Sequence, residues 1–136
     1  MQIDDAIGRT HADSFKFQKA TIFMAMGEHN KAIAMFNELL DDNPNHAEIL
    51  LNRAESHMTL KHYSQAKEDF STLQSYAPND PRNYYRFAEI AEAKNQPGEE
   101  LKNYTLFLQY VDPESVPAEE LQRVKTRIKQ LQGGKP

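Results

Sequence analysis

Two arginines one helical turn apart, Arg82 and Arg86, are the side chains in this sequence best suited to hold an anion. Residues four apart share one face of a helix, so two guanidinium groups can grip one carboxylate. A side-chain amide such as that of Asn52 can bond the backbone of a bound peptide. The same arginines could instead cover the surface or pair with Glu55 and Glu89. The sequence leaves both interpretations open.

Residues for catalysis or metal binding form no recognisable pattern. The five histidines lack metal-site spacing, cysteine is absent, and neither a nucleophile elbow nor a glycine-rich phosphate loop occurs. His29 and His62 fall in expected turns and His46 follows Pro44, which favours solvent-exposed positions for all three. We therefore expect no enzyme activity, no cofactor and no metal site.

Composition narrows the classes of partner. The net charge of −4 comes without a run of basic residues, which argues against nucleic-acid binding. No apolar stretch approaches the roughly 20 residues that span a bilayer, so membrane insertion is not expected. The first residues do not resemble a secretory signal. We expect a cytoplasmic protein, although a piece of a larger or exported protein would share these features.

The apolar pattern predicts an all-helical chain. Apolar residues recur at three- and four-residue steps in seven segments, which is the pattern of amphipathic helices. These segments lie near residues 17–26, 32–40, 49–58, 63–73, 81–91, 101–111 and 118–131. Glycine, asparagine and proline separate them, as expected of turns.

A constant period orders these helices. The step from Ala20 to Ala54 equals the step from Ala54 to Ala88, and it also separates Phe36, Phe70 and Tyr104. Small and aromatic positions in constant order at such a period indicate stacked helical hairpins, which bury their core between neighbours. The sequence therefore predicts three hairpins followed by a capping helix.

The third hairpin departs from the pattern at its second helix. Ala32 and Ala66 mark a close approach of two helices, but Glu100 holds the next position in this series, shortly after Pro97. A bulky side chain at such a contact costs about 1–3 kcal/mol. We therefore expect the start of this helix to be displaced outward.

Several short motifs carry a resemblance to a known family. Asn52-Arg53-Ala54, the segment 63–66, Asp69-Phe70 and Ala77-Pro78-Asn79 together resemble the tetratricopeptide repeat. The resemblance implies an all-α fold, a right-handed superhelical array of three antiparallel helix hairpins with a C-terminal capping helix. The corresponding boundaries are an extension at 1–12, repeats at 13–46, 47–80 and 81–114, a cap at 117–132 and a disordered tail at 133–136.

The resemblance also implies a function, that of a non-enzymatic scaffold or adaptor. Members of the family bind a peptide, an amphipathic helix or a protein terminus in a concave groove lined by the first helix of each hairpin. Carried over by position, the groove residues are Phe17, Thr21, Met24, Leu51, Asn52, Glu55, Met58, Arg82, Tyr85, Arg86 and Glu89.

Two questions about this groove stay open in the sequence. One branch of the family binds the acidic tails of chaperones with a set of basic and asparagine side chains. Asn52, Arg82 and Arg86 match half of this set. The other half, a lysine and an asparagine, is absent because this chain has Phe17 and Thr21 at those positions. Phe17 and Leu51 could also belong partly to the core. The alternative function is self-assembly, in which the groove or the terminal helix joins copies into a homo-oligomer.

Overall fold

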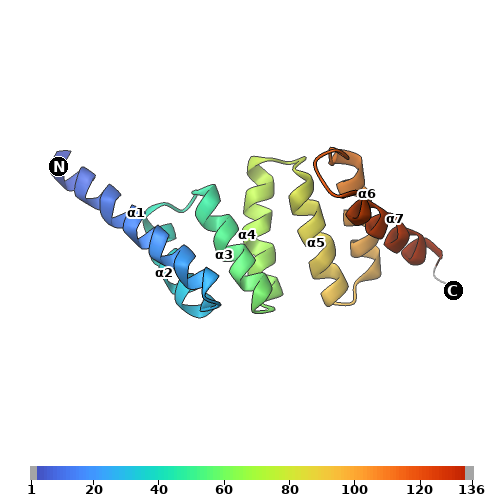
Figure 1. Cartoon of the computed structure of the whole chain (residues 1–136), viewed down its shortest axis with the longest axis horizontal. Helices are drawn as coiled ribbons and strands as arrows, with labels where there is room; N and C mark the ends of the chain where they lie inside the picture. The colour runs from blue at the N-terminus through green and yellow to red at the C-terminus, as the bar shows by residue number, and fades with distance from the viewer. Residues whose placement is uncertain (1–2, 134–136) are drawn as a thin grey trace. The chain divides into compact units, whose positions relative to one another are not determined.

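The computed structural model describes residues 3–133, with side chains from Ala12 onward. In this range it contains helices and no strand, which confirms the predicted all-α fold. The helices labelled in Figure 1 are α1 (Ile3–Ala25), α2 (His29–Asp42), α3 (Ala47–Thr59), α4 (Tyr63–Tyr76), α5 (Pro81–Ala93), α6 (Pro97–Tyr110) and α7 (Ala118–Gly133). Residues 3–12 of the predicted extension belong to α1. Residues 1–2 and 134–136, the ends of the predicted extension and tail, lie outside the described range.

The chain divides into two compact units, an N-terminal unit Met1–Asp69 and a C-terminal unit Phe70–Pro136. The boundary falls inside α4. In the N-terminal unit α1 packs against α2, α2 packs against α3, and α1 also touches α3 (Figure 1). In the C-terminal unit α5 packs against α6, and α6 packs against α7. Each unit therefore brings together at least three helices.

The three hairpin turns share one backbone conformation. Gly27, Lys61 and Asn95 have positive φ values of 81°, 63° and 56°, and each lies one period after the one before. In the first turn the amide of Glu28 donates to Phe23 O at 2.8 Å and that of Gly27 to Met24 O at 3.0 Å. This pair of bonds closes the C-terminus of a helix and requires a left-handed residue at its end.

Lys61 is the least suitable of these three residues, because a left-handed conformation brings its Cβ close to the following carbonyl. We expect Lys61→Gly to raise the free energy of unfolding by about 0.5–1 kcal/mol. Urea unfolding followed by circular dichroism would measure the change. Gly27→Ala is the matched opposite and should destabilise. A loss of stability in Lys61→Gly would show that the lysine side chain contributes more than its backbone costs.

Small residues let the helices of the N-terminal unit approach closely. Ala20, Ala32, Ala54 and Ala66 are all fully buried, at 0% exposure. Phe36, also at 0%, fills the space beside them. The alanine series therefore marks helix contacts, as the period predicts.

A buried ion pair joins α3 to α4 within the same unit. Arg53 donates from Nε to Asp69 Oδ2 at 2.9 Å and from Nη2 to Asp69 Oδ1 at 2.6 Å. Its Nη1 also donates to Asn37 Oδ1 of α2 at 2.9 Å. Hydrogen bonding to Asp69 is the main cause that raises the pKa of Arg53. One guanidinium thus ties three helices together.

The core of the C-terminal unit is aromatic and includes α7. Tyr84, Ala88, Tyr104 and Phe107 form a buried cluster with Val124, which is 0% exposed. Three further apolar residues of α7 pack against this cluster: Leu121, Ile128 and Leu131. The predicted capping helix therefore covers the apolar side of the third hairpin.

Glu100 lies in the first turn of α6, where the sequence predicts an outward displacement of the helix. Pro97 is the first residue of α6, which begins one period after α4, as α4 begins one period after α2. Glu100 is buried at 1% exposure. Arg127 of α7 donates from Nε to Glu100 Oε2 at 2.7 Å and from Nη2 to Oε1 at 3.0 Å. The carboxylate can stay inside because the capping helix supplies its counter-charge.

Candidate peptide-binding surface

The predicted groove residues fall into two sets, one in each unit. Those of α1 and α3 belong to the N-terminal unit, and those of α5 belong to the C-terminal unit. Each set makes a surface of its own, and the two surfaces differ in chemistry.

The predicted groove residues of the N-terminal unit are mostly apolar. On α3, Leu51 is 37% exposed, and Asn52, Glu55 and Met58 are half-buried. These positions share one side of the helix because Leu51 lies four residues before Glu55, and Asn52 and Met58 lie three residues before and after it. On the neighbouring α1, Met24 and Thr21 are also half-buried, and Thr21 Oγ1 donates to Gln18 O at 2.8 Å. The face combines apolar side chains with a side-chain amide, a combination that suits peptide recognition.

Phe17 and Leu51 differ in how far they belong to the core. The ring of Phe17 lies 6.2 Å from that of buried Phe36, tilted by 56°. This contact places Phe17 partly in the core of the first hairpin. Leu51 keeps more than a third of its surface open to solvent. Leu51 is therefore the most accessible apolar side chain of the predicted set in this unit.

On the C-terminal unit, Arg82 is held at the start of α5. Asp80 caps the helix by accepting from Arg82 N at 3.0 Å, and Arg82 Nη2 donates to Asp80 Oδ2 at 2.7 Å. The hydrogen bond from the Arg82 side chain is the main cause that lowers the pKa of Asp80. The side chain of Arg82 is still 81% exposed. This partner, two residues away, was not among those predicted.

Arg86 also has an acidic partner on α5. Its Nη1 donates to Glu89 Oε1 at 2.6 Å, and both side chains are about one-third exposed. The pairing of Arg86 with Glu89 is the alternative that the sequence left open. Each predicted cation therefore already contacts a carboxylate near or on its own helix.

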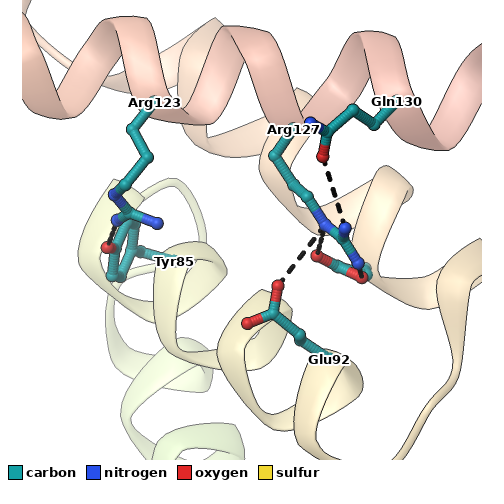
Figure 2. Close-up of polar contacts among 6 residues, drawn as sticks. Tyr85, Glu92, Arg123, Arg127 and Gln130 are labelled. Atoms are coloured by element: carbon teal, nitrogen blue, oxygen red, sulfur yellow. Dashed lines mark hydrogen bonds and ion pairs between the residues drawn. The ribbon is translucent and has the colours of Figure 1, made fainter. Parts of the chain in front are cut away.

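Arg123 of α7 is a cation of this surface that the sequence analysis missed. Its guanidinium lies over the ring of Tyr85, 5.7 Å from the centroid, and Nη2 donates to Tyr85 Oη. Figure 2 shows the Arg123 side chain reaching down from α7 to Tyr85. The signal was present in the period, because Arg123 lies one period after Glu89, a predicted groove position. The equivalence of Arg123 and Glu89 was not predicted because α7 was expected only to cap the third hairpin.

Tyr85 is fixed by its aromatic neighbours. Its ring meets those of Tyr104 and Phe107 edge-on, with centroids 5.9 and 5.2 Å apart. Burial, with smaller effects from Glu120 and Glu89, raises the pKa of Tyr85 to about 12. The phenol therefore stays protonated at neutral pH and can act as a hydrogen-bond donor.

The histidines are less exposed than the sequence suggests. His29 Nδ1 lies 3.1 Å from Ser56 Oγ, and His62 Nδ1 lies 3.2 Å from His57 Nδ1. The expectation of solvent-exposed roles is therefore wrong for His29 and His62, which are half-buried, while His46 is exposed and caps α3. Burial is the main cause that lowers the pKa of His57.

Metal clusters and membrane-spanning helices are both absent from the described part of the chain. Within residues 3–133, no cluster of three or more His, Cys, Asp or Glu side chains is arranged to bind a metal. No helix in this range combines the length and the apolar character needed to cross a bilayer.

Helix hairpins at a constant step, with turns of one conformation and a buried alanine in the first helix of each, define a helical-repeat protein. Residues 23–97 match the sequence profile of the tetratricopeptide repeat. The chain belongs to the tetratricopeptide repeat family. The family assignment confirms the predicted resemblance and the general function of a protein-interaction module.

Two curated relatives support this assignment. The chain is 32% identical over 99 residues to small glutamine-rich tetratricopeptide repeat-containing protein 2 of Saccharomyces cerevisiae, covering 73% of this chain and 28% of the relative. It is 28% identical over 86 residues to a DnaJ homolog subfamily C member 3 homolog of Dictyostelium discoideum, covering 60% and 17%. The chain thus spans less than a third of either relative.

Solved structures share the fold at low sequence identity. The type III secretion chaperone SycD of Yersinia enterocolitica, in complex with a peptide of the translocator YopD, has a TM-score of 0.77 at 18% identity, covering 90% of this chain and 94% of that one. The first tetratricopeptide repeat domain of Spaghetti (RPAP3), bound to the HSP90 peptide SRMEEVD, has a TM-score of 0.66 at 20% identity, covering 84% and 90%. These neighbours confirm the α-solenoid fold class.

Proposed function

We propose that this chain is a non-enzymatic adaptor that binds a segment of another protein on the exposed faces of its first helices. The observation that carries the proposal is the accessible apolar face of α1 and α3, centred on Leu51 at 37% exposure. The eleven predicted groove residues are the proposed contacts, with Phe17 contributing partly through the core.

The chemistry of the N-terminal face suits an extended or helical peptide. Met24 and Met58 are flexible and polarizable, so they can adapt to different apolar side chains. Asn52 offers both a donor and an acceptor to a peptide backbone. Apolar contacts would supply affinity and the amide would fix orientation, which is the usual division in peptide recognition.

The structural neighbours give the proposal independent support. Two of them, SycD and Spaghetti, are complexes with peptides of other proteins. Their likeness to this chain concerns the fold, so the identity of the bound segment is open. The same neighbours favour binding of other proteins over the self-assembly alternative.

We expect Leu51→Asp to weaken peptide binding at least tenfold while helical content is retained. An aspartate at this position would place a charge in the proposed contact, and removing this charge from water when the peptide binds would cost free energy. Fluorescence anisotropy with two labelled probes, SRMEEVD and the YopD peptide of the SycD complex, would measure affinity.

Gln65→Asp is the matched control, because Gln65 is exposed on α4 of the same unit and lies outside the predicted face. It introduces the same charge and should leave affinity within about twofold. If both variants bind like the parent chain, the N-terminal face is not the binding surface. Circular dichroism distinguishes a lost site from a lost fold.

A further inference from the structure

The turn between α3 and α4 brings two histidine side chains into contact. His57 Nδ1 lies 3.2 Å from His62 Nδ1, and both side chains are half-buried. We propose that these two nitrogens form a binding site for a divalent transition-metal ion of the kind that imidazole prefers, with Zn²⁺ as its representative. An ion at this site clamps the end of α3 to the residue before α4. The inference does not depend on the proposed peptide binding.

The first step concerns the distance between the two nitrogens. Two imidazole nitrogens on one tetrahedral Zn²⁺, each about 2.0–2.1 Å from the ion, lie roughly 3.3–3.4 Å apart. The observed 3.2 Å is close to this separation. The ring centroids lie 5.4 Å apart, farther than the nitrogens by about the width of one imidazole ring, so the two nitrogens point toward each other. A small tilt of each ring directs both lone pairs at one ion.

The second step concerns the backbone that holds the pair. His62 N donates to His57 O at 2.8 Å, and Lys61 N donates to Met58 O at 3.0 Å. These bonds close α3 through the left-handed Lys61, so the turn itself brings the two histidines together. A pair of ligands that is already in place loses little conformational entropy when it binds. Two histidines five residues apart across a turn also differ from the helix-face spacing of four, which explains why the sequence did not indicate the site.

The other two hairpin turns have the same backbone bonds without a histidine pair. In the first turn the amide of Glu28 donates to Phe23 O at 2.8 Å. In the third turn the amide of Gln96 donates to Ala91 O, also at 2.8 Å. The turn therefore closes with several kinds of side chain at these two positions. The histidines of the second turn are not needed to form it.

The third step concerns protons and charge. A hydrogen bond between two Nδ1 atoms requires that one ring carries the proton and the other offers a lone pair. When an ion binds, this proton leaves Nδ1 and the ring is protonated on Nε2 instead, so both imidazoles stay neutral. Two acidic neighbours of His57, Asp69 and Glu68, favour a positive charge there. Arg53 opposes it, but its guanidinium is paired with Asp69.

The fourth step concerns the ion that fits. In the part of the chain that the structure describes, no third His, Cys, Asp or Glu side chain completes a metal cluster. Both oxygens of Asp69 already accept from Arg53. The remaining coordination positions are left to water, as one position is in catalytic zinc sites. Ca²⁺ and Mg²⁺ prefer oxygen ligands, so a pair of imidazoles selects against them. The site binds Zn²⁺ more weakly than a structural site with four protein ligands.

Titration of the full chain with Zn²⁺ alone tests the site. Calorimetry gives the affinity, and the ¹⁵N NMR shifts of the imidazole nitrogens identify the ligands. We expect one Zn²⁺ per chain, with the Nδ1 signals of His57 and His62 shifting together, and no such shift with Mg²⁺. Zn²⁺ should also raise the unfolding temperature, because an ion that binds the folded pair stabilises the folded state.

Two substitutions copy the third turn and so keep a side chain with which such a turn closes. His57→Ala and His62→Gln place there the residue types of Ala91 and Gln96. Each should weaken Zn²⁺ binding roughly tenfold or more, since loss of a group that only orients a metal ligand already costs about 10–100-fold. His46→Asn is the matched control, because it removes an exposed histidine and keeps a capping side chain. It should change the affinity less than about twofold.

Three results would overturn the site. The first is a double variant, His57→Ala with His62→Gln, that binds Zn²⁺ as tightly as the parent chain, which would assign the ion to other histidines. The second is a shift of the Nε2 signals of the pair in place of the Nδ1 signals. The third is a parent chain that binds no Zn²⁺. The proposed function is decided separately by Leu51→Asp and the two peptide probes.

Discussion

Replacing Phe36 with alanine is expected to lower the free energy of unfolding by about 3–5 kcal/mol, the usual cost of removing a fully buried aromatic side chain. Phe36 is 0% exposed, and its ring lies 6.2 Å from that of Phe17. The alanine side chains of buried Ala20 and Ala32 are too short to fill the cavity that the substitution would leave. Urea unfolding should show a lower midpoint at an unchanged slope.

Phe15→Ala is the control for this prediction, because it removes the same atoms from the neighbouring helix. Phe15 is 76% exposed, so its loss should change stability by less than about 0.5 kcal/mol. Ile49 holds the position of Phe15 in the second hairpin, but it is only 4% exposed because α2 packs on α3. Equal losses of stability in Phe36→Ala and Phe15→Ala would mean that the core of the first hairpin is not centred on Phe36.

The period predicted most of the fold because it records contacts that recur in every hairpin. Ala20, Ala54 and Ala88 are each 0% exposed, and the aromatic series Phe36, Phe70 and Tyr104 is buried to 1% or less. These positions repeat because the same helix contacts repeat, so residue type alone reveals them. The turns follow the same rule, although Lys61 gives no sign of its left-handed conformation.

The candidate surface was less predictable because its polar contacts depend on single residues rather than on the repeat. Arg82 pairs with Asp80, which the sequence indicates only as a helix cap. Arg123 reaches Tyr85 from 38 residues away, a contact that needs the placement of α7. Which residues of the surface bind a partner is still a prediction, and Leu51→Asp can test it.

Glu100 shows how a single distant residue can change the meaning of a position. In the first two hairpins the equivalent residues are Ala32 and Ala66, both fully buried. A glutamate there indicates displacement if only the hairpin is considered. Glu100 can stay buried because Arg127, which lies 27 residues later, binds both of its carboxylate oxygens. Figure 2 shows the same guanidinium directed at Glu92, 3.4 Å away.

Replacing Arg127 with glutamine is accordingly expected to lower the free energy of unfolding by about 2–3 kcal/mol, somewhat less than the full cost of breaking a buried pair. Removing one partner of a buried ion pair leaves an uncompensated charge, which typically costs about 3–5 kcal/mol. The side chain of Glu100 is 2% exposed, but that of Arg127 is 36% exposed, so water can replace part of the interaction. Lys129→Gln, an exposed charge removal on the same helix, should have little effect.

The pH dependence of Arg127→Gln follows from the two carboxylates that it leaves behind. Burial, together with the hydrogen bond to Glu100, raises the pKa of Glu92. A raised pKa means that the folded state binds the proton more tightly than the unfolded state, so acid stabilises the fold through this group. Without Arg127 this effect grows, because Glu92 and Glu100 lose the counter-charge that they share. The defect should therefore be largest at about pH 7 and smaller at about pH 5.

A second substitution separates the charge of Glu100 from its size. Glu100→Ala in the Arg127→Gln background restores the alanine of the first two hairpins and removes the unpaired carboxylate. We expect the double variant to recover at least half of the lost stability at about pH 7, and to lose the pH dependence of the single variant. No recovery would mean that Arg127 stabilises α7 through the packing of its aliphatic stem, not through Glu100. In that case the burial of Glu100 would need another physical cause.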